Sequence, residues 1–544
     1  MANLRSGDRV SFQLFPYQLR LVEQTLEHLH NYPESAPLIV APCAAGKSVI
    51  IADLCHRFSK LSSGMVLALT HRKELVAQTA SKLPAHLDVG VYSAGLGKKE
   101  LKRITVGGFQ SLRKKVEKLP KVGFIIIDEA DYATAGYREF IEAVRERSPA
   151  LRVIGLTATP YLGDANRTAL HLLPENKRIF TGIASEVQIG ELLALGRLTP
   201  LKPYKAGTQV NTASIKVDTR TGDFNAGAVQ AAMDVDDLTR KITDEIVDIF
   251  ADRNAVMVFC AGVEHTRHVR DALRFRGQTA EMVLGDTPQT ERDQIIADFR
   301  AGKIKYILGV DVLLVGFDAP IMDGIAVLRP TLSARVHVQA LGRGMRVYPG
   351  KLDCLVADFV GNADLHGPID DIEGRPPKLK LGEAPTKMCD NCFSTCLAGL
   401  RLCPTCGYEF PAGDGEGKSQ TFDPNTGLLI SGIIKNDDGT KTYPVADVGY
   451  RVHVTASGAP ALVAEYYSEG RKSPVCTEYY NLWHSNSSTV QRDSMKWLRR
   501  QANEGGSVPL TAQEALARAD MGALRKPKSV TVKPGSPFPV RFGV

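Results

Sequence analysis

Short apolar runs alternate with amphipathic stretches along two long parts of the chain. In residues 36–160 the runs are PLIVAP, MVLALT, FIIIDEA and RVIGLTAT, and the stretches between them repeat apolar residues at helical spacing. The same alternation returns after about residue 250, in runs such as AVMVFC and DCLVADFV. Buried strands separated by helices are typical of a parallel sheet. The pattern predicts two consecutive α/β domains.

The pattern changes between and after these two parts. Residues 196–250 begin with polar, turn-rich sequence and end in a predicted helix, DDLTRKITDEIVDIF, at the entrance to the second domain. Beyond Asn362 a polar segment interrupted by prolines predicts a linker, and a last region mixes strand-like and helix-like patterns. We expect domain 1 at 1–195, domain 2 at 196–365, a linker at 366–387, a cysteine-rich module at 388–411, a second linker at 412–424 and a C-terminal α+β domain at 425–544.

Composition narrows the class of protein only slightly. The 544 residues carry 67 Lys and Arg against 60 Asp and Glu, an excess that suits a polyanion-binding protein without requiring one. Ten Lys and Arg against four Asp and Glu lie between Ser487 and Val544, so this end of the chain is suited to contact phosphates. The N-terminal residues have no uninterrupted apolar core, and no apolar run reaches about 18 residues. We expect a cytoplasmic protein without membrane contact, in the bacterial cytosol or nucleoid, or in host cytoplasm if a phage encodes it.

The stretch APCAAGKSVI, residues 41–50, has the form of a phosphate-binding loop. It follows an apolar strand and opens a helical pattern, so backbone N–H groups and a helix N-terminus can point at a phosphate. Gly46, Lys47 and Ser48 are the residues of such a loop that approach the phosphates, neutralise them and bind Mg²⁺. A Gly-Lys-Ser sequence also arises by chance, so the loop needs support from a second motif.

Two alanines depart from the usual glycine-rich pattern of the loop. Ala41 stands at the first glycine position, and Ala44 replaces a second common glycine. Alanine keeps its backbone N–H group but is disfavoured at positive φ. We expect the loop, with Ala44 and Ala45 among its phosphate contacts, to bind nucleotide if positions 41 and 44 adopt ordinary φ values.

FIIIDEAD, residues 124–131, supplies the acids that such a loop needs. In magnesium-dependent nucleotide hydrolases an apolar strand ending in carboxylates lies opposite the loop. In that arrangement Asp128 holds Mg²⁺, and Glu129 orients or deprotonates a water molecule. Adjacent acids also cap helix N-termini, but their combination with Lys47 and Ser48 favours ATP hydrolysis.

Further motifs follow in order, and the chain resembles superfamily 2 helicases and translocases from about residue 12 to residue 362. The resemblance implies two RecA-like domains with ATP in the cleft between them, Gln18 as the adenine contact, and Gly316 and Asp318 as nucleotide-binding residues. It also implies that Arg343 and Arg346 reach the γ-phosphate from the second domain. The matching stretches are PYQ (16–18), ALTHRKELVAQ (68–78), TVGGFQSL (105–112), LTATP (156–160), VMVFCAGVEHT (256–266), VDVLLVGFDAP (310–320) and QALGRGMR (339–346).

The resemblance favours DNA as the substrate. In RNA-directed DEAD-box proteins the third motif is usually SAT and the sixth opens with histidine, whereas this chain has TAT and Gln339. Within the superfamily the chain looks most like RadD-type repair helicases, through KELVAQ, GLTATP, GFDAP, AVLRP and the Q-x-x-GRG-x-R ending. That likeness implies recombination-linked repair, with single-strand-binding protein and recombinase as partners. A phage replication role fits equally well. The candidates for contact with the nucleic-acid backbone are Arg72, Gln110, Ser111 and Arg329.

Two C-x-x-C pairs predict a structural zinc site. CDNC and CPTC are separated by ten residues, and two such pairs chelate one tetrahedral Zn²⁺ through four thiolates. Four thiolates leave no open position, so this site would hold a small zinc ribbon folded without performing chemistry. Cys396 fits neither pair. The predicted ligands are Cys389, Cys392, Cys403 and Cys406.

Aromatic and basic residues interleave near the C-terminus, in EYYSEGRKSPVCTEYYNLWH and MKWLRRQ. Such residues stack on unpaired bases in some proteins, which would make Tyr480 or Trp483 a DNA contact. They are more often the core of a small domain. Both interpretations stay open from the sequence alone.

Together the motifs predict an ATP- and Mg²⁺-dependent DNA helicase or translocase that acts on single-stranded or branched DNA. Two alternatives remain from the sequence. One is an ATPase that remodels RNA, and the other is a nucleic-acid-binding scaffold that ATP switches with little hydrolysis.

Overall fold

The structure, a computed structural model, describes most of the two α/β domains and most of the region after them. Within this part of the chain, no helix combines the length and the apolar character needed to cross a bilayer. Arg72, Gly316 and Asp318 lie outside the described residues, as do the predicted zinc ligands Cys389, Cys392, Cys403 and Cys406. The described residues are 14–71, 73–84, 87–133, 135–163, 167–212, 215–218, 221–313, 317, 319–375, 386–388, 395–397, 429–436, 438–454, 459–471, 473–483, 487–501, 507–533, 536 and 538–543.

The first α/β domain, lobe 1, is built on a sheet with the strand order β4-β3-β5-β2-β6-β7-β1-β8. Neighbouring strands are parallel except for β4, which runs antiparallel to β3. The carboxyl ends of the parallel strands therefore lie along one edge of the sheet. The strands are β1 (Pro37–Val40), β2 (Met65–Thr70), β3 (Val89–Ser93), β4 (Lys98–Lys99), β5 (Ile104–Gly108), β6 (Val122–Asp128), β7 (Arg152–Thr157) and β8 (Gly182–Glu186).

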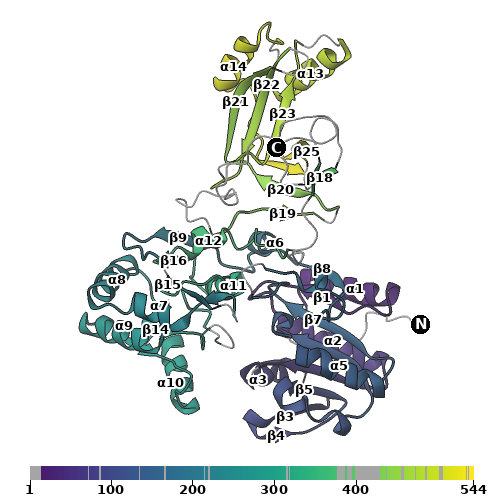
Figure 1. The fold of residues 1–544 in the computed structure, drawn as a ribbon, viewed down its shortest axis with the longest axis vertical. Coiled ribbons are helices and arrows are strands. Elements are labelled where there is room, and N and C mark those ends of the chain that lie inside the picture. Colours follow the sequence, from purple (N-terminus) through teal and green to yellow (C-terminus); the bar gives the residue numbers. More distant parts are fainter. Residues whose placement is uncertain are drawn as a thin grey trace.

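Helices cover both faces of this sheet, because its central strands are apolar on both sides (Figure 1). Ile39 and Ile126 share a buried core with α1 and α2, whereas Leu38 and Ile125 share the opposite core with α5. Alternation of this kind along each strand accounts for the continuous apolar runs in the sequence. The helices of lobe 1 are α1 (Pro16–Asn31), α2 (Lys47–Leu61), α3 (Lys73–Lys82), α4 (Phe109–Leu112), α5 (Ala135–Arg147) and α6 (Ile189–Ala194).

The second α/β domain, lobe 2, has an all-parallel sheet with the strand order β13-β14-β12-β15-β16-β9. Its strands are β9 (Leu201–Lys205), β12 (Val256–Phe259), β13 (Ala280–Met282), β14 (Tyr306–Gly309), β15 (Gly324–Val327) and β16 (Cys354–Asp358). A short hairpin, β10 (Val217–Asp218) and β11 (Asp223–Phe224), precedes the helices. These are α7 (Ala226–Met233), α8 (Asp236–Ile249), α9 (Val263–Phe275), α10 (Gln289–Arg300), α11 (Ala334–Gly344) and α12 (Asn362–His366). The prediction of two tandem parallel-sheet domains is confirmed.

The sequence pattern does not predict five strands of the two large sheets: β3, β4, β5, β8 and β9. Strand β9 comes from the segment interpreted as polar and turn-rich, yet it pairs with β16 along its whole length. Its Pro203 is tolerated because an edge strand needs hydrogen bonds on one side only. The missed strands are very short or contain glycine or proline, so they lack the continuous apolar run on which the pattern depends.

Residues 368–375, which we call the strap, cross from the end of lobe 2 to lobe 1. Ile369 and Ile372 are buried. The backbone N–H of Arg375 donates to the carbonyl oxygen of Arg167 at 2.8 Å, and that of Ala169 donates to Arg375 at 2.8 Å. The first residues of the predicted linker are therefore packed, because two isoleucines and a short backbone pairing anchor an otherwise polar segment.

In its described residues, the C-terminal domain combines two antiparallel sheets with two helices. Tyr480 and Trp497 are fully buried in its core, and the Tyr480 hydroxyl donates to the Glu478 carboxylate at 2.8 Å. The structure therefore favours the core interpretation of Tyr480 over base stacking, and Trp483 packs partly buried against the same core. The elements are β19 (Ile434–Lys435), β20 (Lys441–Pro444), β21 (Asp447–Val454), β22 (Pro460–Tyr467), β23 (Cys476–Tyr480), α13 (Ser487–Arg500), α14 (Ala512–Asp520), β24 (Ser529–Val532) and β25 (Pro539–Gly543). Between the strap and this domain, β17 (Thr386–Met388) pairs with β18 (Thr395–Leu397).

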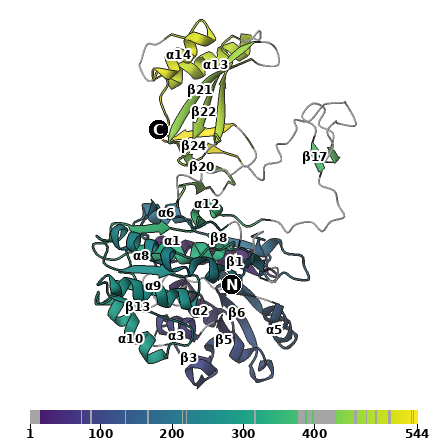
Figure 2. The ribbon, with the colours of Figure 1, turned by 60° about the vertical axis from the view of Figure 1, so that its left-hand side comes forward.

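The C-terminal domain lies next to the end of the lobes that carries α6 and α12 (Figure 2). Contacts with lobe 1 and with the strap join it to the rest of the chain. The Gln188 amide of lobe 1 donates to the Lys435 carbonyl oxygen at 2.6 Å and accepts from the Lys435 backbone N–H at 2.7 Å. Glu373 of the strap pairs with Lys435 at 3.2 Å and with Lys441 at 2.7 Å. The C-terminal domain is thus held against lobe 1 and the strap by hydrogen bonds and ion pairs.

Candidate functional site

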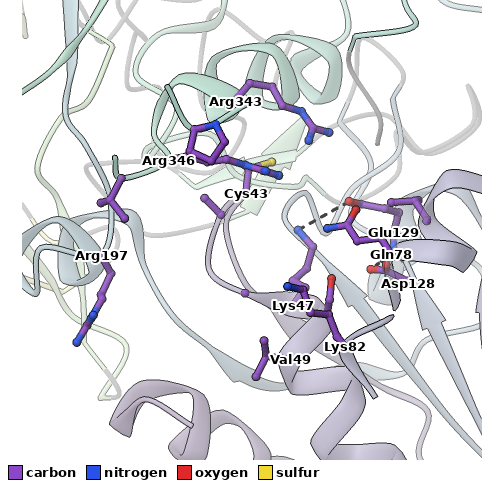
Figure 3. A pocket seen from close by; sticks show the side chains of 16 residues that line it. Cys43, Lys47, Val49, Gln78, Lys82, Asp128, Glu129, Arg197, Arg343 and Arg346 are labelled. Carbon is purple, nitrogen blue, oxygen red and sulfur yellow. Dashed lines mark hydrogen bonds and ion pairs between the residues drawn. The ribbon is translucent and has the colours of Figure 1, made fainter. Parts of the chain in front are cut away.

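A cavity of about 330 Å³ lies between the two lobes, at the carboxyl edge of the lobe 1 sheet (Figure 3). Lobe 1 contributes the loop before α2, the turn after β6 and one side of α3. Lobe 2 contributes the end of α11 and the residues just after it. The cavity is lined by Cys43, Ala44, Gly46, Lys47, Ser48, Val49, Leu75, Gln78, Lys82, Asp128, Glu129, Arg197, Pro320, Arg343, Arg346 and Val347.

The loop between β1 and α2 differs in one respect from the expectation. Ala41 is buried at the end of β1, where its backbone N–H donates to the Thr157 carbonyl oxygen at 2.9 Å. Ala44, however, has a φ of 69°, in the left-handed region. The condition of ordinary φ values, under which the sequence analysis expects the loop to bind nucleotide, is therefore not met at position 44, and the loop adopts a turn that glycine would adopt more easily. Gly46 also has a positive φ, 79°, directly before α2 begins.

Lys47 lies at the first turn of α2 and faces the acids of the opposite turn. Its Nζ is 3.9 Å from Glu129 Oε1 and donates to the Ala41 carbonyl oxygen at 3.4 Å (Figure 3). Burial lowers the pKa of Lys47, but the Glu129 and Asp128 carboxylates raise it more, so the net pKa lies above its usual value. The lysine therefore stays charged in the cavity.

Asp128 and Glu129 follow directly from the last residues of β6. Asp128 is 6% exposed, and its pKa is raised to about 7, first by burial and then by the Glu129 carboxylate, against the lowering effect of Lys47. Glu129 has a φ of 50°, which turns the chain sharply after the strand. Crowded carboxylates of this kind gain from a divalent cation, because it favours their ionised forms.

Arg343 and Arg346 line the cavity from the side of lobe 2, across from Lys47 (Figure 3). The Arg343 guanidinium also donates to the Phe317 carbonyl oxygen at 2.9 Å. Burial lowers the pKa of Arg346. The lobes touch here, because a Cβ atom placed on Gly342 would lie 2.6 Å from Cys43 Cβ. The close approach at Gly342 lets the two arginines share one cavity with the lobe 1 residues.

A second contact between the lobes lies beside the cavity and is not predicted by the sequence analysis. Arg335 of α11 donates to the Asp131 carbonyl oxygen at 3.2 Å, and its Nη1 is 3.8 Å from Asp131 Oδ2. Its guanidinium also lies 4.1 Å from the centre of the Tyr132 ring. The Tyr132 hydroxyl donates to Gln339 Oε1 at 3.2 Å. Arg335, Gln339 and Gly342 are spaced i, i+4, i+7, a signal of one helix face that could have pointed to Arg335.

Asp131 connects this contact to lobe 1. Its Oδ1 accepts from the Thr157 hydroxyl at 2.6 Å, at the end of β7. The pKa of Asp131 is raised to about 6, first by burial and then by Glu129, while Arg335 lowers it. A buried carboxylate next to Glu129 therefore depends on Arg335 for its charge, and that arginine belongs to the other lobe.

Gln18, the predicted adenine contact, lies beside the loop. Its side-chain amide donates to the Ala45 carbonyl oxygen at 3.1 Å and accepts from the Phe15 backbone N–H at 3.0 Å. The adenine contact remains a prediction, since both ends of the amide bind protein groups here. Arg197, which the sequence analysis does not single out, lines the cavity and stacks 3.7 Å from the centre of the Phe15 ring. A stacked cation and ring offer a flat wall for a base.

The predicted backbone contacts are distributed over both lobes. Gln110 is exposed on α4. Ser111 Oγ accepts from the backbone N–H of Ala94 at 3.0 Å. Arg329 is mostly covered, pairs with Asp311 and lies 5.7 Å from the centre of the Phe259 ring. Gln110 is therefore accessible to solvent, whereas the Arg329 guanidinium forms an ion pair within lobe 2.

The cavity residues fit a nucleoside triphosphate with a magnesium ion. The N-terminus of α2 and Lys47 offer positive charge from one side, and the two arginines offer it from the other. Ser48 and Asp128 are oxygen ligands of the type that Mg²⁺ prefers. The donors and acceptors therefore suit a polyphosphate and its cation.

Two family models match the chain, one in each lobe. Residues 11–162 match the model described as "Type III restriction enzyme, res subunit". Residues 239–348 match the model described as "Helicase conserved C-terminal domain". The chain therefore has two RecA-like domains, similar to the paired domains of superfamily 2 helicases, and these helicase-type domains support an enzyme with ATPase activity.

The chain is also similar to individual proteins. It is 26% identical over 386 residues to a 51.5 kDa protein of a Lactococcus phage, an alignment that covers 69% of this chain and 78% of the phage protein. It is 25% identical over 336 residues to IRC3 of Saccharomyces cerevisiae, named as an ATP-dependent helicase, covering 58% of this chain but 47% of IRC3. The alignment with the phage protein therefore spans most of that protein, and the alignment with IRC3 spans about half.

The fold has a counterpart among solved structures. A fragment of an HsdR-type subunit of a type I restriction enzyme from Vibrio vulnificus superposes with a TM-score of 0.50 at 19% identity, covering 67% of each chain. This likeness supports the two-lobe fold.

Proposed function

We propose that the protein is an ATP-dependent DNA helicase or translocase that unwinds or remodels single-stranded or branched DNA. One observation carries the proposal. A single cavity joins Lys47, Asp128 and Glu129 of lobe 1 to Arg343 and Arg346 of lobe 2. A nucleotide held there would contact both lobes, so its hydrolysis would change how the lobes are held together.

Six of the cavity residues have assigned roles in this proposal. Lys47 and the backbone N–H groups of the loop hold the phosphates, and Glu129 orients the attacking water. Ser48 and Asp128 hold Mg²⁺, which when bound neutralises charge on the phosphate oxygens. Arg343 and Arg346 stabilise the charge that develops as the terminal phosphate leaves.

Closure of the lobes would be linked to movement along DNA. The loops at the carboxyl edges of both sheets are available to grip a backbone, and alternating closure would shift one lobe relative to the other along the strand. The TAT sequence and Gln339 support DNA over RNA, on the resemblance described above.

The biological setting rests on resemblance. The RadD-type likeness supports a role in repair or recombination, with single-strand-binding protein and recombinase as partners. The similarity to a phage protein is compatible with replication instead. We also propose that the two C-x-x-C pairs hold a structural Zn²⁺ in a ribbon between the motor and the C-terminal domain.

ATP turnover measured with single-stranded, duplex and forked DNA and with matched RNA tests this function. We expect turnover to rise at least tenfold with DNA, more with single-stranded or forked DNA than with RNA, and to disappear in Lys47→Ala. Stronger stimulation by RNA would make the protein an RNA remodeller. Nucleotide-dependent DNA affinity with negligible turnover would make it a scaffold, and strong turnover by Lys47→Ala would remove the assignment of the site.

A further inference from the structure

Positive charge is concentrated at one end of lobe 1. Between Ser93 and Lys118 the chain has eight Lys and Arg against two Asp and Glu, an excess of six. The whole chain has a formal net charge of +7. A segment that makes up a small fraction of the protein therefore carries a charge excess almost equal to that of the whole chain.

The structure separates these cations into two groups. Lys102 pairs with Asp88 at 2.9 Å, and Arg103 donates to the carbonyl oxygens of Ser59 and Ser62, so both serve the fold. The others form no ion pair with any described residue, and all but Lys115, which is half-buried, are exposed. We call the five of them that lie in β4 or directly after α4 the basic tip: Lys98, Lys99, Arg113, Lys114 and Lys115.

The basic tip lies on the carboxyl edge of the sheet, beyond the cavity. The strand order places β5, β3 and β4 at the opposite end of the sheet from β1 (Figure 1). The hydrogen bond from Ala94 N to Ser111 Oγ, 3.0 Å, joins the loop after β3 to the end of α4. Lys98 pairs in register with Ser93, so both parts of the tip adjoin this bond. The tip therefore lies next to α4, the short helix that contains Gln110 and Ser111.

Ligands of open α/β sheets bind outside the carboxyl ends of the strands. Here the end near β1 and β6 forms the nucleotide cavity, and the end near β3 and β5 carries the cations of the basic tip. Positive charge held without acidic partners costs free energy through mutual repulsion, which an anionic ligand would relieve. Five cations from two loops match a repeating anion better than a single one.

We propose that the basic tip binds the phosphate backbone of the nucleic acid that flanks the strand gripped between the lobes. This inference rests on the proposed function. The tip lies outside the cleft, so it would contact a flanking segment and leave the short strand inside the cleft untouched. Its role would be to raise affinity for long ligands through released counterions, without reading sequence.

The test compares a full-length variant with Lys98, Lys99, Arg113, Lys114 and Lys115 all changed to Gln with the wild-type chain. Affinity is measured against salt concentration for a strand of about eight nucleotides and for one of about 30. A smaller variant, Lys98→Gln/Lys99→Gln, has a matched control in Lys177→Gln/Lys241→Gln, which removes two exposed lysines elsewhere on the lobes.

On the long strand we expect the slope of log affinity against log salt to become shallower by about 0.7 for each phosphate that is no longer neutralised, hence by about 2 to 3.5 in the fivefold variant. On the short strand the slope should not change, and basal ATP turnover should match wild type. Equal slopes for variant and wild type on the long strand would overturn the inference. An equal decrease on both strands would also overturn it, because the tip would then contact the gripped strand.

This outcome is independent of the function test. The affinity for nucleic acid is measured without ATP hydrolysis. The proposal for the basic tip can therefore be supported or rejected whatever the ATPase result. Wild-type turnover that does not respond to any nucleic acid would reject the motor function, and the salt slopes would still decide whether the tip binds phosphates.

Discussion

The two walls of the cavity position their functional groups by different means. Lobe 1 presents Lys47 and Glu129 from tight turns next to strand ends, and those turns contain the left-handed residues Ala44 and Glu129. Lobe 2 presents Arg343 from the last turn of an ordinary helix, α11, and Arg346 from the residues just after it. Local backbone geometry positions the groups of lobe 1, whereas packing between the lobes brings the arginines of lobe 2 to the cavity.

This difference separates binding from hydrolysis. Under the proposed closure, the lobe 1 groups should keep their mutual geometry, because they belong to one sheet. The arginines face Lys47 across the cavity where Gly342 and Cys43 bring the lobes into contact, so their position relative to Lys47 depends on how the lobes pack. Lobe 1 should therefore determine whether nucleotide binds, and lobe 2 should determine how fast it is hydrolysed.

Among the groups that lobe 2 contributes, the largest expected effect comes from the two arginines. Arg343→Ala and Arg346→Ala should each lower kcat for DNA-stimulated ATP hydrolysis about a thousandfold, because their charge acts most strongly on the departing phosphate. The dissociation constant for a fluorescent ATP analogue should change less than about tenfold. Steady-state turnover and nucleotide titration on the same preparations measure both quantities.

A surface arginine of the same lobe provides the control. Arg276 pairs with Asp244 on the outer helices, and Arg276→Ala should leave kcat within about twofold of wild type. If affinity and turnover fall in equal proportion in the cavity variants, the arginines act on the bound nucleotide before reaction, and the proposed division between walls is wrong.

A smaller effect is expected at the second contact between lobes. Arg335→Gln leaves Asp131 buried without its cation and should lower DNA-stimulated kcat about tenfold, with a smaller effect on basal turnover. Asp131→Asn removes the need for that cation. The double variant should therefore lose less than the product of the single losses, with a coupling of about 1 kcal/mol.

Arg335→Lys distinguishes a positioning role from simple packing. Lysine retains the charge beside Asp131, so it should restore part of the stimulated rate that Gln removes. Additive losses in the double variant, or no recovery with lysine, would show that Arg335 does not couple the lobes through Asp131.

Features that depend on adjacent residues can be predicted from this sequence, whereas contacts between residues distant along the chain cannot. The central strands and the loop of lobe 1 are predictable because burial on both faces and local turn chemistry leave marks on adjacent residues. The contact of Arg335 with Asp131 and that of the strap with Arg167 could not be predicted, because the partners are distant in sequence. The stacking of Arg197 on Phe15 could not be predicted for the same reason, since only the fold brings these two residues together.

The left-handed residue in the loop allows the finest test of the lobe 1 wall. Ala44→Gly removes a Cβ atom from a residue at φ 69° and should stabilise the protein against urea by up to about 1 kcal/mol, with ATP bound a fewfold more tightly. Ala45→Gly is the matched control, because Ala45 is buried and has no positive φ, so glycine there should destabilise by about 0.5 to 1 kcal/mol. Opposite signs at neighbouring positions would show that backbone geometry, rather than side-chain volume, shapes this wall. If both variants lose stability equally, the turn at Ala44 is not strained, and the lobe 1 wall owes its shape to packing as the lobe 2 wall does.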